Sequence, residues 1–209
     1  LRCLARAEDS SLYVVLLACV KILLFKYTAE PDVVVGSPVS GRHLAGLENQ
    51  VGCYINTLPL RDVIHEDFSF SEIVGRVRIT FLEALDHQAF PFENLLGENG
   101  SPFEPDANPL FTVAVILQNQ PQVALALEGL EVTPMPVHKE TSLFDLVFEF
   151  RDAGPGLELH LSYRSSLFTP ERMERLWTHF ETLVAHCLEA PSRPVGDFSV
   201  LPTEELELL

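Results

Sequence analysis

One helical stretch limits the folds open to this chain more than any other feature. Residues 12–25 read LYVVLLACVKILLF, an apolar run in which Lys21 is the one charged side chain. A membrane span needs about 20 apolar residues, and this run is shorter and is closed by Lys26. It also lacks the small-residue cleavage site of a secretory signal peptide. We therefore predict a helix that is capped by Asp9 and Ser10 and buried on nearly all sides within a large fold.

The rest of the chain alternates between strand-like and helix-like segments. Ser69 and Glu72 have the spacing of a capping box, and Thr169 with Pro170 marks another helix start. This order predicts an α/β fold in which a mixed sheet is flanked by helices, followed by a surface tail over 191–209 that leads to a next domain. The predicted strands are 33–35, 52–60, 111–117, 125–132, 144–150 and 157–163, and the further helices are 69–85, 91–96 and 170–188.

Composition excludes several classes of partner. Lys and Arg total 14 against 30 Asp and Glu, a formal net charge of −16. A nucleic-acid partner is excluded, because phosphate backbones are bound by clustered cations. Neither the histidines nor the cysteines have metal-ligand spacing, so we expect no metal site. Cys3, Cys19, Cys53 and Cys187 are predicted to be reduced, buried thiols, which is typical of a cytoplasmic protein without a membrane segment.

Two serines are candidate nucleophiles. Ser37 and Ser40 lie between Gly36 and Gly41, but neither has the G-x-S-x-G surroundings of an esterase elbow. A free-standing hydrolase is therefore a weak alternative, to be tested with a fluorophosphonate probe. Composition and spacing alone indicate only an acidic α/β domain.

Five short motifs give the chain a more specific character. Together they resemble, in order, the second half of the condensation domains of nonribosomal peptide synthetases, over nearly the whole chain. At Ala89 the chain departs from this pattern, because the family usually has an acidic residue there. The motifs are VVGSPVSGR at 34–42, VGCYINTLPLR at 51–61, HQAFPFE at 87–93, NPLF at 108–111 with QN at 118–119, and FDL at 144–146 with YRSSLF at 163–168.

The resemblance implies a fold like chloramphenicol acetyltransferase, with two similar lobes around a tunnel. Peptidyl-carrier domains deliver donor and acceptor on phosphopantetheine arms, and the domain joins them through an amide bond. The family's reactive histidine belongs to an H-H-x-x-x-D-G motif in the amino-terminal lobe, and this chain has no adjacent histidine pair. Residues 1–209 are therefore expected to be the carboxy-terminal lobe alone. We expect it to bind no cofactor directly, to contain no catalytic residue and to be inactive without its partner lobe.

The resemblance also suggests roles for polar residues in the motifs. Arg42 is expected to pair with the aspartate of the missing motif across the cleft, the alternative being an ordinary surface arginine. Asn56 and Thr57 interrupt an apolar strand, so they line the tunnel or make side-chain-to-backbone bonds. The candidate structural and tunnel residues are Ser37, Arg42, Asn56, Thr57, Asn108, Gln118 and Asn119.

Two surfaces are expected to make contacts between domains. The hairpin that begins at Phe144, Asp145 and Leu146 resembles the family segment that crosses to the other lobe, so an isolated lobe should expose an apolar strand edge and self-associate. Arg76 and Arg78 are the nearest approach to a basic carrier-docking spot on this acidic chain. The rival interpretation of the whole chain is a non-catalytic, condensation-like docking module that recruits a carrier or a tailoring enzyme.

Overall fold

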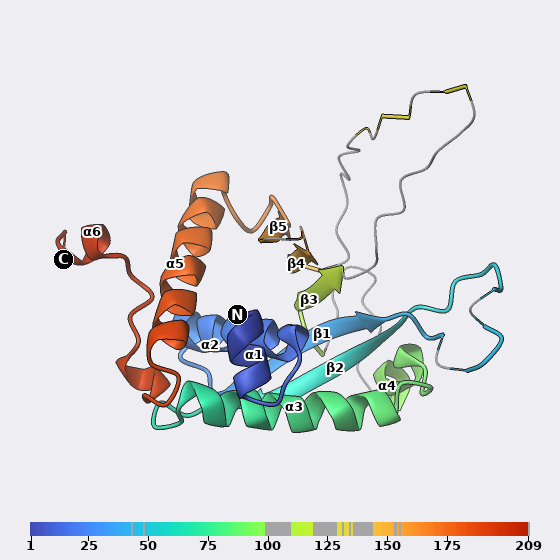
Figure 1. The fold of residues 1–209 in the computed structure, drawn as a ribbon, viewed down its shortest axis with the longest axis horizontal. Coiled ribbons are helices and arrows are strands. Elements are labelled where there is room, and N and C mark those ends of the chain that lie inside the picture. The colour runs from blue at the N-terminus through green and yellow to red at the C-terminus, as the bar shows by residue number, and fades with distance from the viewer. Residues whose placement is uncertain are drawn as a thin grey trace.

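The structure is a computed structural model that describes residues 1–42, 44–47, 49–98, 110–118, 129–130, 132–133, 135, 144–152, 154 and 156–208. A mixed sheet runs through the middle of the molecule and helices cover one of its faces (Figure 1). The helices are α1 (Arg2–Ala7), α2 (Leu12–Thr28), α3 (Phe70–Asp86), α4 (Phe92–Glu98), α5 (Pro170–Glu189), the 3-10 turn η1 (Val195–Asp197) and α6 (Thr203–Leu206). The strands are β1 (Asp32–Val39), β2 (Asn56–Val63), β3 (Val113–Gln118), β4 (Leu146–Asp152) and β5 (Leu157–Tyr163).

The described strands form one sheet in the order β2-β1-β3-β4-β5. The outer pairs β1–β2 and β4–β5 are antiparallel, and the inner pairs β1–β3 and β3–β4 are parallel. This confirms the predicted mixed sheet. The pairing of β1 with β3 is limited to Gly36 and Ala114, so the two strands separate towards their carboxyl ends.

The hairpin that begins with Phe144, Asp145 and Leu146 corrects one prediction. It belongs to this chain's own sheet, because β4 pairs with β3 from Val113↔Leu146 to Gln118↔Arg151. The register places alternate β4 side chains in the core, where Phe148 and Phe150 are buried. The prediction that this hairpin crosses to another lobe is therefore wrong for this structure.

Helix α2 forms the centre of the core, as its apolar run predicts. Every residue from Val14 to Leu23 is buried, and the helix contacts α1, α3, α5, β1 and β3. Its N-cap is Ser11, whose Oγ accepts the Val14 N–H, and not Asp9 or Ser10 as predicted. Helix α1, which was not predicted from the sequence, precedes it. None of the helices in the described ranges is long and apolar enough to cross a lipid bilayer.

The later helix starts agree with the sequence patterns, but the tail is partly anchored in the core. Ser69 and Glu72 form the predicted capping box of α3, and Thr169 caps α5. In the segment predicted as a surface tail, Val195 and Phe198 are buried, while α6 lies at the surface.

The predictions for the cysteines and for a strand over 125–132 have mixed outcomes. Cys19 and Cys187 are buried as predicted, but Cys3 and Cys53 are exposed, so burial is wrong for these two. All four thiols are free. Most of the strand predicted over 125–132 lies outside the described residues.

Candidate functional site

Three of the five motifs, those at 34–42, 51–61 and 87–93, meet at one end of the sheet, whereas 144–146 and 163–168 lie at the opposite end. The carboxyl end of β1, the loop over 40–55, the start of β2 and helix α4 all lie at the end where the three motifs meet (Figure 1). The carboxyl end of β3 approaches the same region, because β1 and β3 are parallel. Crevices outside the carboxyl ends of parallel strands are a common place for ligands in α/β folds.

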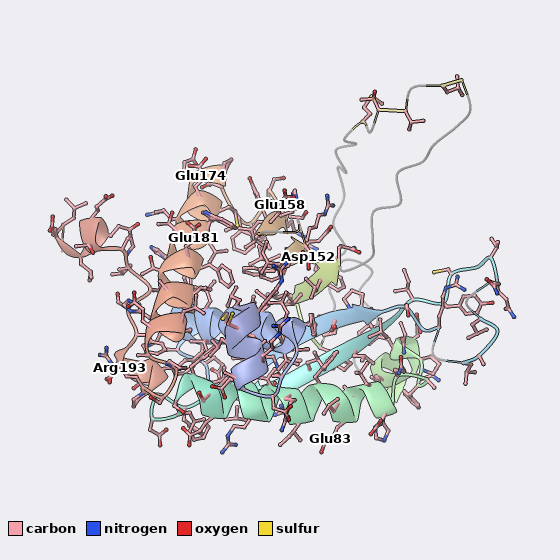
Figure 2. The ribbon with its side chains drawn as sticks, viewed as in Figure 1. Glu83, Asp152, Glu158, Glu174, Glu181 and Arg193 are labelled. Atoms are coloured by element: carbon pink, nitrogen blue, oxygen red, sulfur yellow. The ribbon has the colours of Figure 1, made fainter. Side chains whose placement is uncertain are left out.

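A cavity of about 530 Å³ opens where β1 and β3 separate. Its walls come from the start of α2, from Phe81 of α3, and from the ends of β1 and β3. Arg2 of α1 and Asp152, at the end of β4 (Figure 2), also line the cavity and form an ion pair at 2.6 Å. This volume lies within the roughly 300–1,000 Å³ of small-molecule sites.

Two hydroxyl groups lie against this cavity. Tyr13 Oη is 2.6 Å from Ser37 Oγ and 3.3 Å from the carbonyl oxygen of Val115. The Tyr13 ring packs against Phe81 with ring centroids 4.9 Å apart. Burial raises the pKa of Tyr13 to about 12, because the phenolate would lose its water. The phenol is therefore neutral at pH 7 and acts as a hydrogen-bonding group, not as a base.

Arg42 holds the loop that follows β1. Its guanidinium donates to the backbone carbonyls of Leu47, of Gln50 at 2.9 Å and of Gly52 at 3.0 Å. It also stacks over the Tyr54 ring, with Cζ 4.6 Å from the ring centroid. Several backbone segments of this loop are thus fixed by one side chain. Pairing of Arg42 with an aspartate of another lobe stays a prediction.

The neighbouring glycine shows how closely this loop is packed. Gly41 has φ +64°, in the left-handed region that favours glycine. A Cβ at this position would also lie 1.7 Å from the carbonyl oxygen of Tyr54. Both constraints require glycine in front of Arg42.

Asn56 joins the start of β2 to the turn between α3 and α4. Its Nδ2 donates to the carbonyls of Gln88 at 2.9 Å and Phe90 at 2.7 Å, and its Oδ1 accepts the Phe92 N–H at 3.1 Å. Of the two alternatives from the sequence, the structure shows the side-chain-to-backbone bond. The HQAFPFE segment is a structural turn that this asparagine fixes to the sheet, and Thr57 beside it is half-buried.

Other predicted residues are not brought into the cavity. Gln118 is exposed at the end of β3, and Asn108 and Asn119 lie outside the described residues. On α3, the Arg76 guanidinium lies 4.3 Å above the Phe68 ring, and Arg78 pairs with Asp9 at 2.8 Å. Within the described ranges no cluster of side chains could hold a metal ion.

Of the residues that line the cavity, only Ser37 was among the predicted site residues, and those that were missed include Arg2, Tyr13, Phe81 and Asp152. Tyr13 and Phe81 fit the apolar pattern of their helices, so nothing in the sequence separates them from core residues. Ser37 was identified, but its partner is a phenol, and no described histidine lines the cavity. The hydrolase alternative therefore gains no support.

Comparisons with known proteins agree with this geometry. The family model of the condensation domain matches residues 1–209. The chain is 34% identical over 206 residues to tyrocidine synthase 3 of Brevibacillus parabrevis, a match that covers 99% of this chain and 3% of that protein. It thus spans a small part of this relative's length.

Two solved structures share the fold. One is holo-AB3403, a four-domain nonribosomal peptide synthetase bound to AMP and glycine, with a TM-score of 0.87, 19% identity, and coverage of 97% of this chain and 16% of that one. The other is the X-domain of teicoplanin biosynthesis in complex with OxyB, with a TM-score of 0.85, 23% identity, and coverage of 96% and 45%. At these identities they establish the fold alone, which confirms the predicted α/β architecture. With the family match over its full length, this chain belongs to the condensation-domain family of nonribosomal peptide synthetases.

Proposed function

We propose that this chain is the carboxy-terminal lobe of a condensation domain that forms an amide bond between carrier-tethered aminoacyl or peptidyl substrates. The observation that carries the proposal is the convergence of the family motifs around Ser37, Arg42 and Asn56 on one end of the sheet, beside a cavity of about 530 Å³. The chain also covers 45% of the X-domain chain, which is the share expected of one lobe out of two.

The chemistry of amide formation defines what such a lobe supplies. An amine attacks a thioester carbonyl, so both groups must be held close together and a proton must be removed. Tyr13 is unsuited to take that proton, because its pKa is raised to about 12 by burial. No two histidines are adjacent in the 209 residues. The described residues instead form the cavity wall and fix two segments at this end of the sheet. Arg42 fixes the loop between β1 and β2, and Asn56 fixes the turn between α3 and α4.

A product assay tests this division of labour. The parent protein with both lobes should form the dipeptidyl product from two loaded carriers, and replacing the reactive histidine of its H-H-x-x-x-D-G motif should abolish product. This chain alone should form none. Amide formation by the isolated chain would contradict the proposal.

Carrier domains and their phosphopantetheine arms are the proposed partners. The described surface is strongly acidic, as Glu83 on α3, Glu158 on β5, and Glu174 and Glu181 on α5 illustrate (Figure 2). An acidic carrier is repelled by such a surface and needs a local basic spot. Arg76 stays the better candidate because it is exposed, whereas Arg78 is held by Asp9.

Charge reversal tests this docking site. Arg76→Glu with Arg78→Glu in the parent should slow carrier-dependent condensation. Reversal of Arg172 and Arg175 on α5 should leave it unchanged, as a matched control for the loss of two positive charges. Equal rates in both double variants would exclude α3 as the docking helix.

Self-association of the chain is a further part of the proposal. Strand β5 is the outer strand of the described sheet next to β4, so one side of its backbone has no described strand beside it. Light scattering should show a mass that rises with concentration. A monomer at every concentration would contradict it. The four free cysteines accord with a reducing, cytoplasmic location, which we also propose.

A recruitment module is the second candidate, and one observation favours it. A structural neighbour with a TM-score of 0.85 is an X-domain solved in complex with OxyB. A condensation-like fold can therefore serve to bind another protein. The preceding lobe discriminates between the two candidates: an intact H-H-x-x-x-D-G motif supports the enzyme, and a broken one supports recruitment.

A further inference from the structure

The cavity between β1 and β3 combines an apolar wall with a hydrogen-bonded pair of hydroxyl groups, those of Tyr13 and Ser37. Leu12, Pro38, Val39, Phe81 and Leu117 supply much of the apolar wall. Ser37 is only 3% exposed, yet it lines the cavity together with Tyr13. A buried hydroxyl beside an apolar cavity is costly unless all of its hydrogen-bonding capacity is used.

The protons of the two hydroxyls can be arranged in two ways. In one arrangement Ser37 donates to Tyr13, and Tyr13 donates to the Val115 carbonyl at 3.3 Å. In the other, Tyr13 donates to Ser37 across 2.6 Å, and the Ser37 proton turns into the cavity. Since a hydroxyl both donates and accepts, rotation of two O–H bonds converts the first arrangement into the second. The pair can therefore offer a hydrogen bond to a ligand without moving a heavy atom.

The lining restricts the class of ligand. The charged residues that line the cavity are Arg2 and Asp152, and they are paired with each other at 2.6 Å. Neither side chain is therefore available to pair with a charged ligand. A charged group next to the apolar wall would lose its hydration without gaining an ionic partner. The site thus suits an uncharged, apolar chain that carries a carbonyl oxygen.

We propose that this cavity binds the uncharged acyl chain or apolar side chain of a thioester substrate, with Ser37 donating a hydrogen bond to a carbonyl oxygen of the ligand. Tyr13 is a positioning residue, because it acts on the ligand through Ser37. The assignment rests on the proposed function, which supplies the thioester. It adds a selectivity for uncharged, extended chains that the family assignment does not contain.

Direct binding to this chain tests the proposal without requiring amide formation. The probe is S-hexanoyl-N-acetylcysteamine, followed by methyl and amide NMR shifts. We expect shifts at Leu12, Val39 and Leu117. The S-acetyl probe should bind at least about tenfold more weakly, because each buried methylene contributes. The anionic S-succinyl probe should not bind.

Substitutions separate the roles of the two hydroxyls. Ser37→Ala should weaken hexanoyl binding about tenfold, as expected for one lost hydrogen bond, and Ser37→Thr should restore most of it. Tyr13→Phe should weaken binding several-fold in the wild-type background and not at all in the Ser37→Ala background. A structural role for Tyr13 would instead reduce affinity in both backgrounds. Ser165→Ala, at an exposed serine away from the cavity, is the matched control.

A filling substitution provides an independent check. Val39→Phe should block the probe, whereas Val63→Phe, at the opposite end of the β1–β2 pair, should not. Shifts that persist in Val39→Phe, or equal affinity for the hexanoyl and succinyl probes, would overturn the proposal. Binding by this chain together with a parent that makes no amide would instead overturn the proposed function. If the parent forms amides and its preference for chain length is unchanged by Val39→Phe, only the assignment of this cavity as the acyl site is overturned.

Discussion

Lys21, the one charged residue in the apolar run of α2, is fully buried and forms an ion pair with Asp62 of β2. Its Nζ also donates to the Leu60 carbonyl at 2.9 Å, and the other Asp62 oxygen accepts the Thr80 hydroxyl at 2.6 Å. Burial lowers the pKa of Lys21, and the attraction of Asp62 opposes that shift. One polar network therefore ties α2, β2 and α3 together inside the core.

Breaking this pair from either side should destabilise the fold strongly. Lys21→Met leaves Asp62 buried with an unpaired charge, and Asp62→Asn does the same to Lys21. Each should lower the free energy of unfolding by about 3–5 kcal/mol. The double variant Lys21→Met/Asp62→Leu should lose less than the sum of the two single losses, because no unpaired charge is left behind.

Urea denaturation measures these differences. The control is Arg61→Met, next to Asp62 on β2, which removes the exposed ion pair between Arg61 and Asp32 of β1 and should change little. Single variants that unfold at the wild-type urea concentration would show that the buried pair contributes nothing.

The buried phenol of Tyr13 predicts a loss of stability at high pH. Its pKa is raised to about 12 in the folded chain, against about 10 when unfolded. Between these values the unfolded chain releases the proton and the folded chain keeps it, so stability falls as pH rises. The Tyr13 contribution is fully present below about pH 10, and its loss reaches about 2.7 kcal/mol by about pH 12.

Comparison with Tyr13→Phe isolates this contribution, because lysines and other tyrosines titrate in the same range. Urea denaturation at about pH 9 and about pH 11.5 should show a steeper loss in the wild-type chain than in the variant. Parallel losses would mean that Tyr13 ionises normally in the folded state.

Much of the fold follows from local patterns in the sequence. The apolar run of α2, the capping box at Ser69 and Glu72, and the Thr169–Pro170 helix start depend on neighbouring residues, and the structure confirms them. The extent of β1 was harder to predict. The strand continues past Gly36 to Val39, and a Cβ at Gly36 would lie 2.1 Å from the Phe111 ring. This packing involves a residue far along the chain.

The candidate site was predictable only in part, for the same reason. Ser37, Arg42 and Asn56 belong to recognisable motifs, but their partners do not. Tyr13 is 24 residues from Ser37, and Asn56 bonds to carbonyls more than 30 residues away. These contacts depend on how β1, β2 and α3 pack, which periodicity does not encode. The hairpin after Phe144 was misplaced because a strand's sequence does not specify which sheet it joins.

Asn56 should be necessary for docking of α4. Asn56→Ala removes two donors and one acceptor, and leaves the Phe92 N–H without its partner. We expect unfolding free energy to fall by about 1–3 kcal/mol. Asn56→Asp keeps the acceptor but places a carboxylate against the carbonyls of Gln88 and Phe90, so it should destabilise at least as much at neutral pH.

Acidification separates the two Asn56 variants. Protonation of the new carboxyl restores one donor, so Asn56→Asp should recover stability at low pH relative to Asn56→Ala. Thermal unfolding with Thr57→Val as the neighbouring control measures this. If Asn56→Asp is as stable as wild type at neutral pH, the donated hydrogen bonds are not important.

Arg42→Lys should loosen the loop over 40–55 without unfolding the core. A lysine ammonium lacks the planar fork that reaches the carbonyls of Gln50 and Gly52 together, and it stacks less well on Tyr54. Loss of even one hydrogen bond from a charged donor predicts about tenfold faster amide exchange in this loop. Hydrogen–deuterium exchange should show this local change, with Arg193→Lys, at a paired surface arginine elsewhere, as the control.

If the chain is one lobe of a two-lobed parent, as proposed, the same variant in that parent tests the predicted cross-cleft pair. If Arg42 contacts the aspartate of the H-H-x-x-x-D-G motif, the effects of Arg42→Lys and of that Asp→Asn on amide formation will not add. Additive effects would mean that Arg42 serves its own loop alone.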